Sequence, residues 1–133
     1  MIVPDASAVA LLVADPGADP RVTTARQVLV ADPAWAVPEH WRTEVLSAVR
    51  GLWLGHKLDD DLAHRAVAAL AQMVVQVTPT LLLLDRMWQL RSAMSTYDAG
   101  YVAAAEAHAC TLVTADARLA RSGAARCPVH VIV

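Results

Sequence analysis

Residues 1–13 read MIVPDASAVALLV: a short apolar run, one acid, and a second apolar run rich in small residues. The first run, Ile2 to Pro4, is typical of a short buried strand, and the second is typical of a helix. Asp5 is therefore predicted at the carboxyl end of a strand, directly before a helix. In open α/β sheets, ligands bind at this edge. A carboxylate buried there needs a cation or hydrogen bonds, because burying an unpaired charge is unfavourable.

Strands and helices alternate along the rest of the chain. We predict further strands at 35–37, 74–77, 111–114 and 129–133. The predicted helices are 7–14, 20–31, 39–54, one capped by the acids 59–61 and ending at 72, one opened by residues 78–80 and ending at 94, one capped by Thr96 over 97–108, and a short one at 117–121. Such alternation favours a three-layer α/β sandwich with a parallel five-stranded sheet. Pro4 lacks an N–H group, so it must lie at a strand end or where no ladder bond is required.

The composition indicates one globular domain spanning 1–133. The chain has 133 residues, of which 56% are hydrophobic and 18% charged, and this apolar surplus predicts a covered interface. No apolar stretch approaches the roughly 20 residues that span a bilayer. The N-terminus also lacks the basic start and cleavage site of a signal peptide, so we expect a cytoplasmic protein and no membrane. Cys110 and Cys127 lack metal-site spacing and are expected to be reduced thiols.

Four acids in apolar or small-residue surroundings define the candidate site: Asp5, Glu44, Asp98 and Asp116. Asp5 and Asp116 follow predicted strands, whose carboxyl ends meet at one edge of a parallel sheet. Glu44 and Asp98 lie early in predicted helices, and the placement of Asp98 at that edge is the least direct step. Such an oxygen donor set suits Mg²⁺ or Mn²⁺ rather than a softer metal. A metal held there would activate water for attack on a phosphodiester.

The net charge of −2 argues weakly against a nucleic-acid partner. A bound metal would largely neutralise the four acids, which leaves eleven basic residues against nine other acids, since the chain has 13 acids in all. The basic residues expected near RNA phosphates are Arg86, Arg91, Arg118 and Arg121. The five histidines share no spacing for zinc or for a Ser/His/Asp triad, so nucleophilic catalysis has little support and His40 is expected to be dispensable for the chemical step.

Four segments together resemble the motifs of PIN-domain ribonucleases, in order and in spacing: Val3 to Ser7, Pro38 to Glu44, Thr96 to Ala99, and Thr114 to Asp116. The size and strand order look like those of VapC toxins of type II toxin–antitoxin pairs. The resemblance implies a Mg²⁺- or Mn²⁺-dependent endoribonuclease centred on the four acids, with the hydroxyls of Ser7 and Thr114 orienting ligands or water. It also implies the strand order 3-2-1-4-5, a homodimer, and inhibition by a cognate VapB-like antitoxin whose tail occupies the active groove.

Two positions depart from the family pattern. Arg118 lies in the segment after Asp116, where many relatives carry a further acid, so a second metal ion would be weakly held. Pro4 replaces the β-branched residue that usually precedes the first acid. Neither change affects the four acids themselves.

Each acid also has a purely structural explanation. Asp5 and Asp116 could cap the helices that follow them, Glu44 could pair with Arg42 or Arg50, and Asp98 could be an ordinary first-turn acid. Two other functions keep the same fold: a catalytically silent PIN-like domain that only binds a protein, and a DNA-directed nuclease with the same acidic centre. A phosphorylatable receiver domain is disfavoured, because it needs a late lysine and the only lysine here is Lys57.

Overall fold

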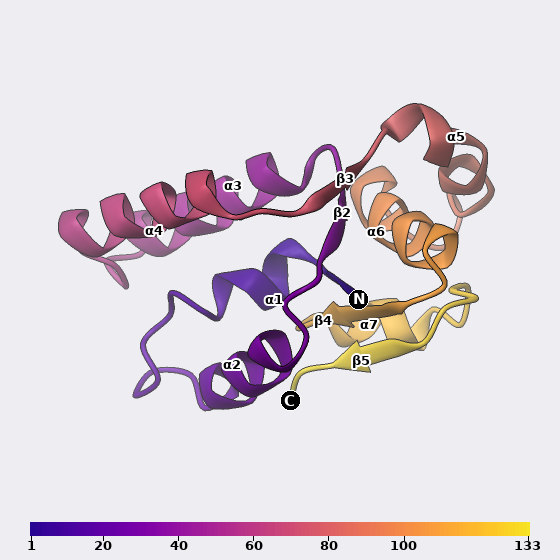
Figure 1. The fold of residues 1–133 in the computed structure, drawn as a ribbon. Coiled ribbons are helices and arrows are strands. Elements are labelled where there is room, and N and C mark those ends of the chain that lie inside the picture. The colour runs from indigo at the N-terminus through magenta and orange to yellow at the C-terminus, as the bar shows by residue number, and fades with distance from the viewer.

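The computed structural model describes residues 1–133 (Figure 1). The five strands are β1 (Ile2–Pro4), β2 (Ala36–Pro38), β3 (Gln76–Thr78), β4 (Thr111–Thr114) and β5 (Val129–Val131). The seven helices are α1 (Ala6–Ala10), α2 (Arg21–Ala31), α3 (Trp41–Leu54), α4 (Asp60–Gln72), α5 (Thr80–Gln89), α6 (Thr96–Ala107) and α7 (Ala117–Arg121). The predicted number and order of these elements are therefore correct.

The central strands separate two hydrophobic clusters, because successive strand residues point to opposite faces. In β1, Ile2 packs into the cluster formed with α1 and α2, whereas Val3 packs into the larger cluster formed mainly with α3, α5 and α6. In β4, Leu112 and Val113 divide in the same way. Helices therefore cover both faces of the strands, and the prediction of a three-layer α/β fold is confirmed.

The predicted continuous five-stranded sheet is only partly correct. All pairings are parallel, but hydrogen bonding divides the strands into β1-β4-β5 and β2-β3. The two groups meet only through a bridge between Ile2 and Trp35, beside a hydrogen bond from the Ile2 N–H to the Ala34 carbonyl (3.0 Å). With this bridge included, the order reads 3-2-1-4-5. Pro4 and Pro38 end β1 and β2 and cannot donate ladder hydrogen bonds, which limits pairing between these strands.

Several predicted boundaries shift in the structure. The predicted helix 7–14 ends at Ala10, after which the N–H groups of residues 11–13 bond to carbonyls three residues back, so the chain tightens into turns. The helix predicted to reach 94 likewise ends at Gln89. The third strand begins at Gln76 rather than 74. Ser95, not Thr96, caps α6, since its hydroxyl accepts from the Asp98 N–H (3.2 Å).

Helices α3 and α4 form a hairpin that projects away from the strands (Figure 1). A small cluster of Val49, Leu58 and Ala66 joins the two helices. Asp59 caps α4 by accepting from the Leu62 N–H (2.8 Å), as the sequence predicts for this run of acids. None of the helices combines the length and apolarity needed to cross a membrane.

Candidate functional site

Asp5 is held in a cradle of hydrogen bonds at the end of β1. Asp5 is only 4% exposed. One carboxylate oxygen accepts from the Ser7 hydroxyl (2.6 Å) and the Ala8 N–H (3.0 Å), and the other accepts from the Thr114 hydroxyl. The Ser7 hydroxyl in turn accepts from the Ala115 N–H (2.9 Å). Helix capping therefore does occur at Asp5, but β4 also takes part in fixing the carboxylate.

Burial raises the pKa of Asp5 above its usual value, and this effect outweighs the hydrogen bonds from Ser7, Thr114 and Ala8, which favour the charged form. The negative charge of Asp98 raises the pKa of Asp5 further. No basic side chain forms an ion pair with Asp5. The strand end thus carries a well-oriented buried acid that lacks a positive counter-charge.

Asp116 follows β4 and differs from Asp5 in having a cation beside it. Its carboxylate accepts from the Arg118 Nε–H (3.0 Å) and from Arg118 Nη2 (2.7 Å), and it also caps α7 through the Arg118 backbone N–H (3.0 Å). These Arg118 contacts lower the pKa of Asp116. The Arg118 side chain is 79% exposed, so solvent screens this pair and water can replace it.

Glu44 occupies the first turn of α3 and makes neither of the ion pairs considered from the sequence. Arg42 donates instead to the carbonyls of Leu70 and Met73. The Glu44 Oε1 atom is buried without a hydrogen-bond partner, and the nearest positive group is His40 Nε2 at 3.8 Å, which is charged only when the ring is protonated. Burial of a carboxylate oxygen without a partner is unfavourable, so this position calls for an explanation.

Asp98 lies in the first turn of α6, and its carboxylate forms no ion pair. Its charge acts on Asp5 and on Arg118, which places it beside the strand-end acids. Tyr101 is one turn further along the same helix and is only 2% exposed. Burial and the neighbouring carboxylates of Glu44 and Asp5 raise the pKa of Tyr101, so the phenol is neutral.

The beginning of α3 contacts α6 through His40. The His40 ring packs edge-on against Tyr97 and Tyr101, with ring centroids 5.4 Å and 5.2 Å away, and its Nε2 atom lies 3.0 Å from the Tyr97 carbonyl. Gly100 makes this contact possible, because a Cβ there would lie 2.4 Å from His40 Cε1. The helix that carries Glu44 is thereby fixed against the helix that carries Asp98.

The four acids thus lie around the carboxyl edge of β1 and β4, but no three of the chain's acidic, histidine or cysteine side chains lie within joint reach of one metal ion. Their chemistry fits a hard divalent cation. Asp5 and Asp98 lack ion pairs, Glu44 has a buried oxygen without a partner, and only Asp116 is already neutralised. The ligand set remains a prediction on these grounds.

Other sequence predictions near the site have mixed outcomes. Arg118 and Arg121 both lie in the last turn of α7, close to Asp116. Arg86 forms a half-buried ion pair with Glu106 (2.7 Å), so its charge is already balanced, and its role near RNA stays a prediction. Arg91 stacks on Trp88, 4.5 Å from the ring centroid. The sequence analysis did not identify His40 or Tyr101 as site residues. The only sequence signals for them are that His40 lies four residues before Glu44 and that Tyr101 lies three residues after Asp98.

Residues 2–124 match the PIN domain family. The chain is 38% identical over 132 residues to Ribonuclease VapC9 of Mycobacterium tuberculosis. This alignment covers 99% of this chain and 98% of the relative. Ribonuclease VapC12 of the same organism is 33% identical over 123 residues, with 92% of each chain covered. The crystal structure of M. tuberculosis VapC20, a toxin that cleaves the sarcin-ricin loop, superposes with a TM-score of 0.67 at 21% identity, covering 92% of this chain and 95% of that one.

The chain therefore belongs to the PIN-domain family. Within that family, its similarity along nearly the full length is to VapC ribonucleases, so the resemblance to VapC-type toxins inferred from four short motifs is confirmed. The similarity to VapC20 supports the fold alone, because the identity is low.

Proposed function

We propose that this protein is a divalent-metal-dependent endoribonuclease and the toxin of a toxin–antitoxin pair, built as one PIN domain over 1–133. The observation that carries the proposal is the unbalanced negative charge at one sheet edge. Asp5 is buried without a cation, and the charge of Asp98 raises the pKa of Asp5. Glu44 has a buried carboxylate oxygen without a partner. The similarity to named VapC ribonucleases supports RNA as the substrate.

Asp5, Glu44, Asp98 and Asp116 are the proposed ligands of Mg²⁺ or Mn²⁺. Such an ion supplies Lewis acidity, which activates water and stabilises charge on phosphodiester oxygens. Ser7 and Thr114 hold the Asp5 carboxylate in one orientation through its two oxygens. Fixed orientation of a ligand by neighbouring hydrogen bonds increases its effectiveness in metal sites.

Arg118 has two roles in this proposal. It neutralises Asp116 in the metal-free protein, and its exposed guanidinium is available for an RNA phosphate once Asp116 turns to the metal. Arg121, in the same last helical turn, adds positive charge to this edge. The cleaved strand would then pass between α7 and the acids.

Product chemistry tests the proposed reaction. Hydrolysis by water expels the 3′ oxygen, so the products should carry 5′-phosphate and 3′-hydroxyl ends, and EDTA should stop cleavage. Ends with 2′,3′-cyclic phosphate, or full cleavage by Asp116→Ala in EDTA, would contradict the mechanism. Cleavage of a DNA strand of matching sequence, but not of the RNA, would favour the DNA-directed nuclease. A protein that neither binds Mn²⁺ nor cuts either strand would be the silent PIN-like domain.

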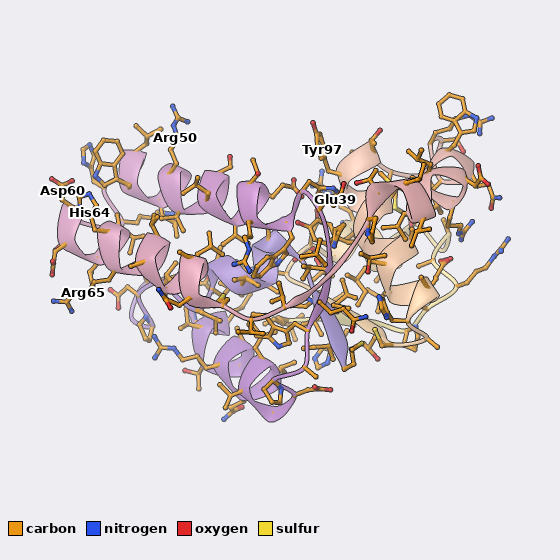
Figure 2. The ribbon with its side chains drawn as sticks, turned by 45° about the horizontal axis from the view of Figure 1, so that its top comes forward. Glu39, Arg50, Asp60, His64, Arg65 and Tyr97 are labelled. Atoms are coloured by element: carbon orange, nitrogen blue, oxygen red, sulfur yellow. The ribbon has the colours of Figure 1, made fainter.

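The proposed partners are a second copy of the chain and an antitoxin. On α5 the exposed apolar side chains are Leu81, Leu82, Leu84 and Trp88, and Trp53 and Leu54 are exposed at the end of α3. A groove of about 420 Å³, which Trp53 also lines, lies between α3 and α4, and Figure 2 shows Arg50, Asp60 and His64 on this hairpin. Exposed apolar area of this kind is typical of protein contacts.

Light scattering tests this assembly. A homodimer is expected at tens of micromolar, whereas a 14.2 kDa monomer with no co-purifying product of the neighbouring gene would contradict it.

Induction of the chain in the cytoplasm should arrest growth, and co-expression of that neighbouring gene should relieve the arrest. Arrest that persists with an Asp5→Asn chain would separate the toxicity from the nuclease centre.

A further inference from the structure

Two buried polar atoms without hydrogen-bond partners lie next to each other at the acidic site. They are Glu44 Oε1 on α3 and the Tyr101 hydroxyl on α6, and the same His40 ring lies 3.8 Å from the first residue and 5.2 Å from the ring of the second. Nearly all buried polar side-chain atoms in native proteins have a partner, so a neighbouring pair of exceptions calls for a functional explanation. One atom is a carboxylate acceptor and the other is a phenol, which can donate.

The two groups are complementary and close together. The Glu44 carboxylate is near enough for hydrogen bonding to the phenol to contribute to the raised pKa of Tyr101, although the two oxygen atoms do not reach the geometry of a regular hydrogen bond. Asp5 contributes as well, so the hydroxyl lies where carboxylates from β1 and α3 converge. Toward a carboxylate, a neutral phenol can act only as a hydrogen-bond donor.

The Tyr101 ring is held in place while Glu44 has room to move. The His40 ring packs against Tyr101 at 5.2 Å, and Gly100 allows this close approach of α3 to α6. Tyr101 is 2% exposed, whereas the Glu44 side chain is 32% exposed. A change of the Glu44 rotamer can therefore close the gap to the fixed hydroxyl.

We propose that Tyr101 is a positioning residue of the acidic centre, whose hydroxyl donates to Glu44 and orients that carboxylate toward a cation shared with Asp5 and Asp98. The inference rests on the proposed function, because it assigns a role within the same metal site. It explains why a tyrosine, rather than a phenylalanine, occupies a fully buried position of α6.

The test is Tyr101→Phe in the full-length chain, with Mn²⁺ affinity measured by calorimetry. Removal of a hydrogen bond to a metal ligand typically weakens metal binding about 10- to 100-fold, so a loss of at least about tenfold is expected. The melting temperature in EDTA should stay equal to that of the wild type or rise, because the variant removes a buried hydroxyl without a partner. A structural tyrosine would give the opposite pair of results, namely a lower melting temperature and unchanged affinity.

Tyr97→Phe is the matched control. Tyr97 lies one turn earlier on the same helix and packs against the same His40 ring, but it is 57% exposed and projects away from the ribbon (Figure 2). Mn²⁺ affinity of Tyr97→Phe should equal that of the wild type. A Tyr101→Phe protein that binds Mn²⁺ as tightly as the wild type would overturn the role of Tyr101 and leave the proposed function intact.

A double variant identifies the partner of the hydroxyl. If Tyr101 acts through Glu44, adding Tyr101→Phe to Glu44→Gln should lower Mn²⁺ affinity no further than Glu44→Gln alone. Independent, additive losses would overturn the assignment to Glu44. A wild-type chain that fails to bind Mn²⁺ at all would overturn the proposed metal site itself, which is a separate and recognisable outcome.

Discussion

The two halves of the acidic site differ in how their polar groups are satisfied. At the strand ends, Asp5 receives three hydrogen bonds and Asp116 is paired with Arg118. On the helices, Glu44 and Tyr101 each retain a buried polar atom without a partner. The polar groups at the strand ends are therefore held by regular hydrogen bonds and an ion pair, whereas two polar atoms on the helices are not.

This difference follows from how each half is built. Adjacent parallel strands hold Asp5 and Thr114 at a spacing set by backbone hydrogen bonds, so their side chains meet. Glu44 and Asp98 lie on separate helices, α3 and α6, whose relative position depends on side-chain packing around His40 and Gly100. Packing tolerates small adjustments that a hydrogen-bonded ladder does not.

The largest effect, on RNA cleavage, is expected from Asp5→Asn, which removes the buried acid at the strand ends. Loss of a charged ligand removes several kcal/mol of transition-state stabilisation, so RNA cleavage should fall about 10³-fold or more. Asparagine also caps helices well, so the fold should persist. Asp59→Asn is the matched control, because Asp59 caps α4 in the same way far from the site. Cleavage that falls equally in both proteins would contradict a special role for Asp5.

The helix half can be broken without touching an acid, through Gly100→Ala. The new Cβ would meet the His40 ring, and such overpacking costs about 1–3 kcal/mol of unfolding free energy. Gly51→Ala on α3 is the control, since its Cβ meets nothing within 4 Å and alanine is the better helix former by about 1 kcal/mol. Urea unfolding should thus shift in opposite directions for the two variants. A stabilised Gly100→Ala protein would show that His40 does not set the spacing of α3 and α6.

A smaller effect, on Mn²⁺ affinity, is expected from removing the cation that pairs with Asp116. Arg118→Ala frees the Asp116 carboxylate, so Mn²⁺ affinity should rise, but by no more than about fivefold because the ion pair is exposed to solvent. The KM for RNA should rise at the same time, because a phosphate contact is lost. Arg121→Ala, which makes no hydrogen bond to Asp116, should leave Mn²⁺ affinity nearly unchanged. Weaker Mn²⁺ binding by Arg118→Ala would contradict competition between Arg118 and the metal.

The smallest effect is a pH dependence that distinguishes two acids of the strand half. The pKa of Asp5 is raised above 3.8, so ionising it destabilises the metal-free fold. The stability of Asp5→Asn relative to the wild type should therefore increase as pH rises from about 3.8 through the folded pKa of Asp5, and then level off. The pKa of Asp116 is lowered, so its contribution is present above 3.8 and lost at lower pH. Carboxyl carbon NMR titration in EDTA should place Asp5 above Asp116, and the reverse order would contradict this contrast.

Much of the fold was accessible from the sequence because local signals agreed with the tertiary structure. The strands 2–4 and 111–114 were predicted to the residue, since each is a short apolar run bounded by polar or small residues. The break between β1 and β2 was not predicted, although Pro4 and Pro38 end these strands and cannot donate ladder hydrogen bonds. Helix ends at Ala10 and Gln89 were missed, since turns that tighten after a helix carry no strong local signal.

The sequence by itself determined the alternating α/β fold through its periodicity, and the family through four motifs that resemble those of PIN-domain ribonucleases. The four acids as a metal site, with the hydroxyls of Ser7 and Thr114, stay a prediction from the same motifs. Only the tertiary structure decided which charges are balanced. It paired Asp116 with Arg118, directed Arg86 to Glu106, and left the Glu44 Oε1 atom and the Tyr101 hydroxyl buried near each other without a regular hydrogen bond. Residues distant along the chain meet only through packing, so the state of each buried polar group depends on distances that no local pattern encodes.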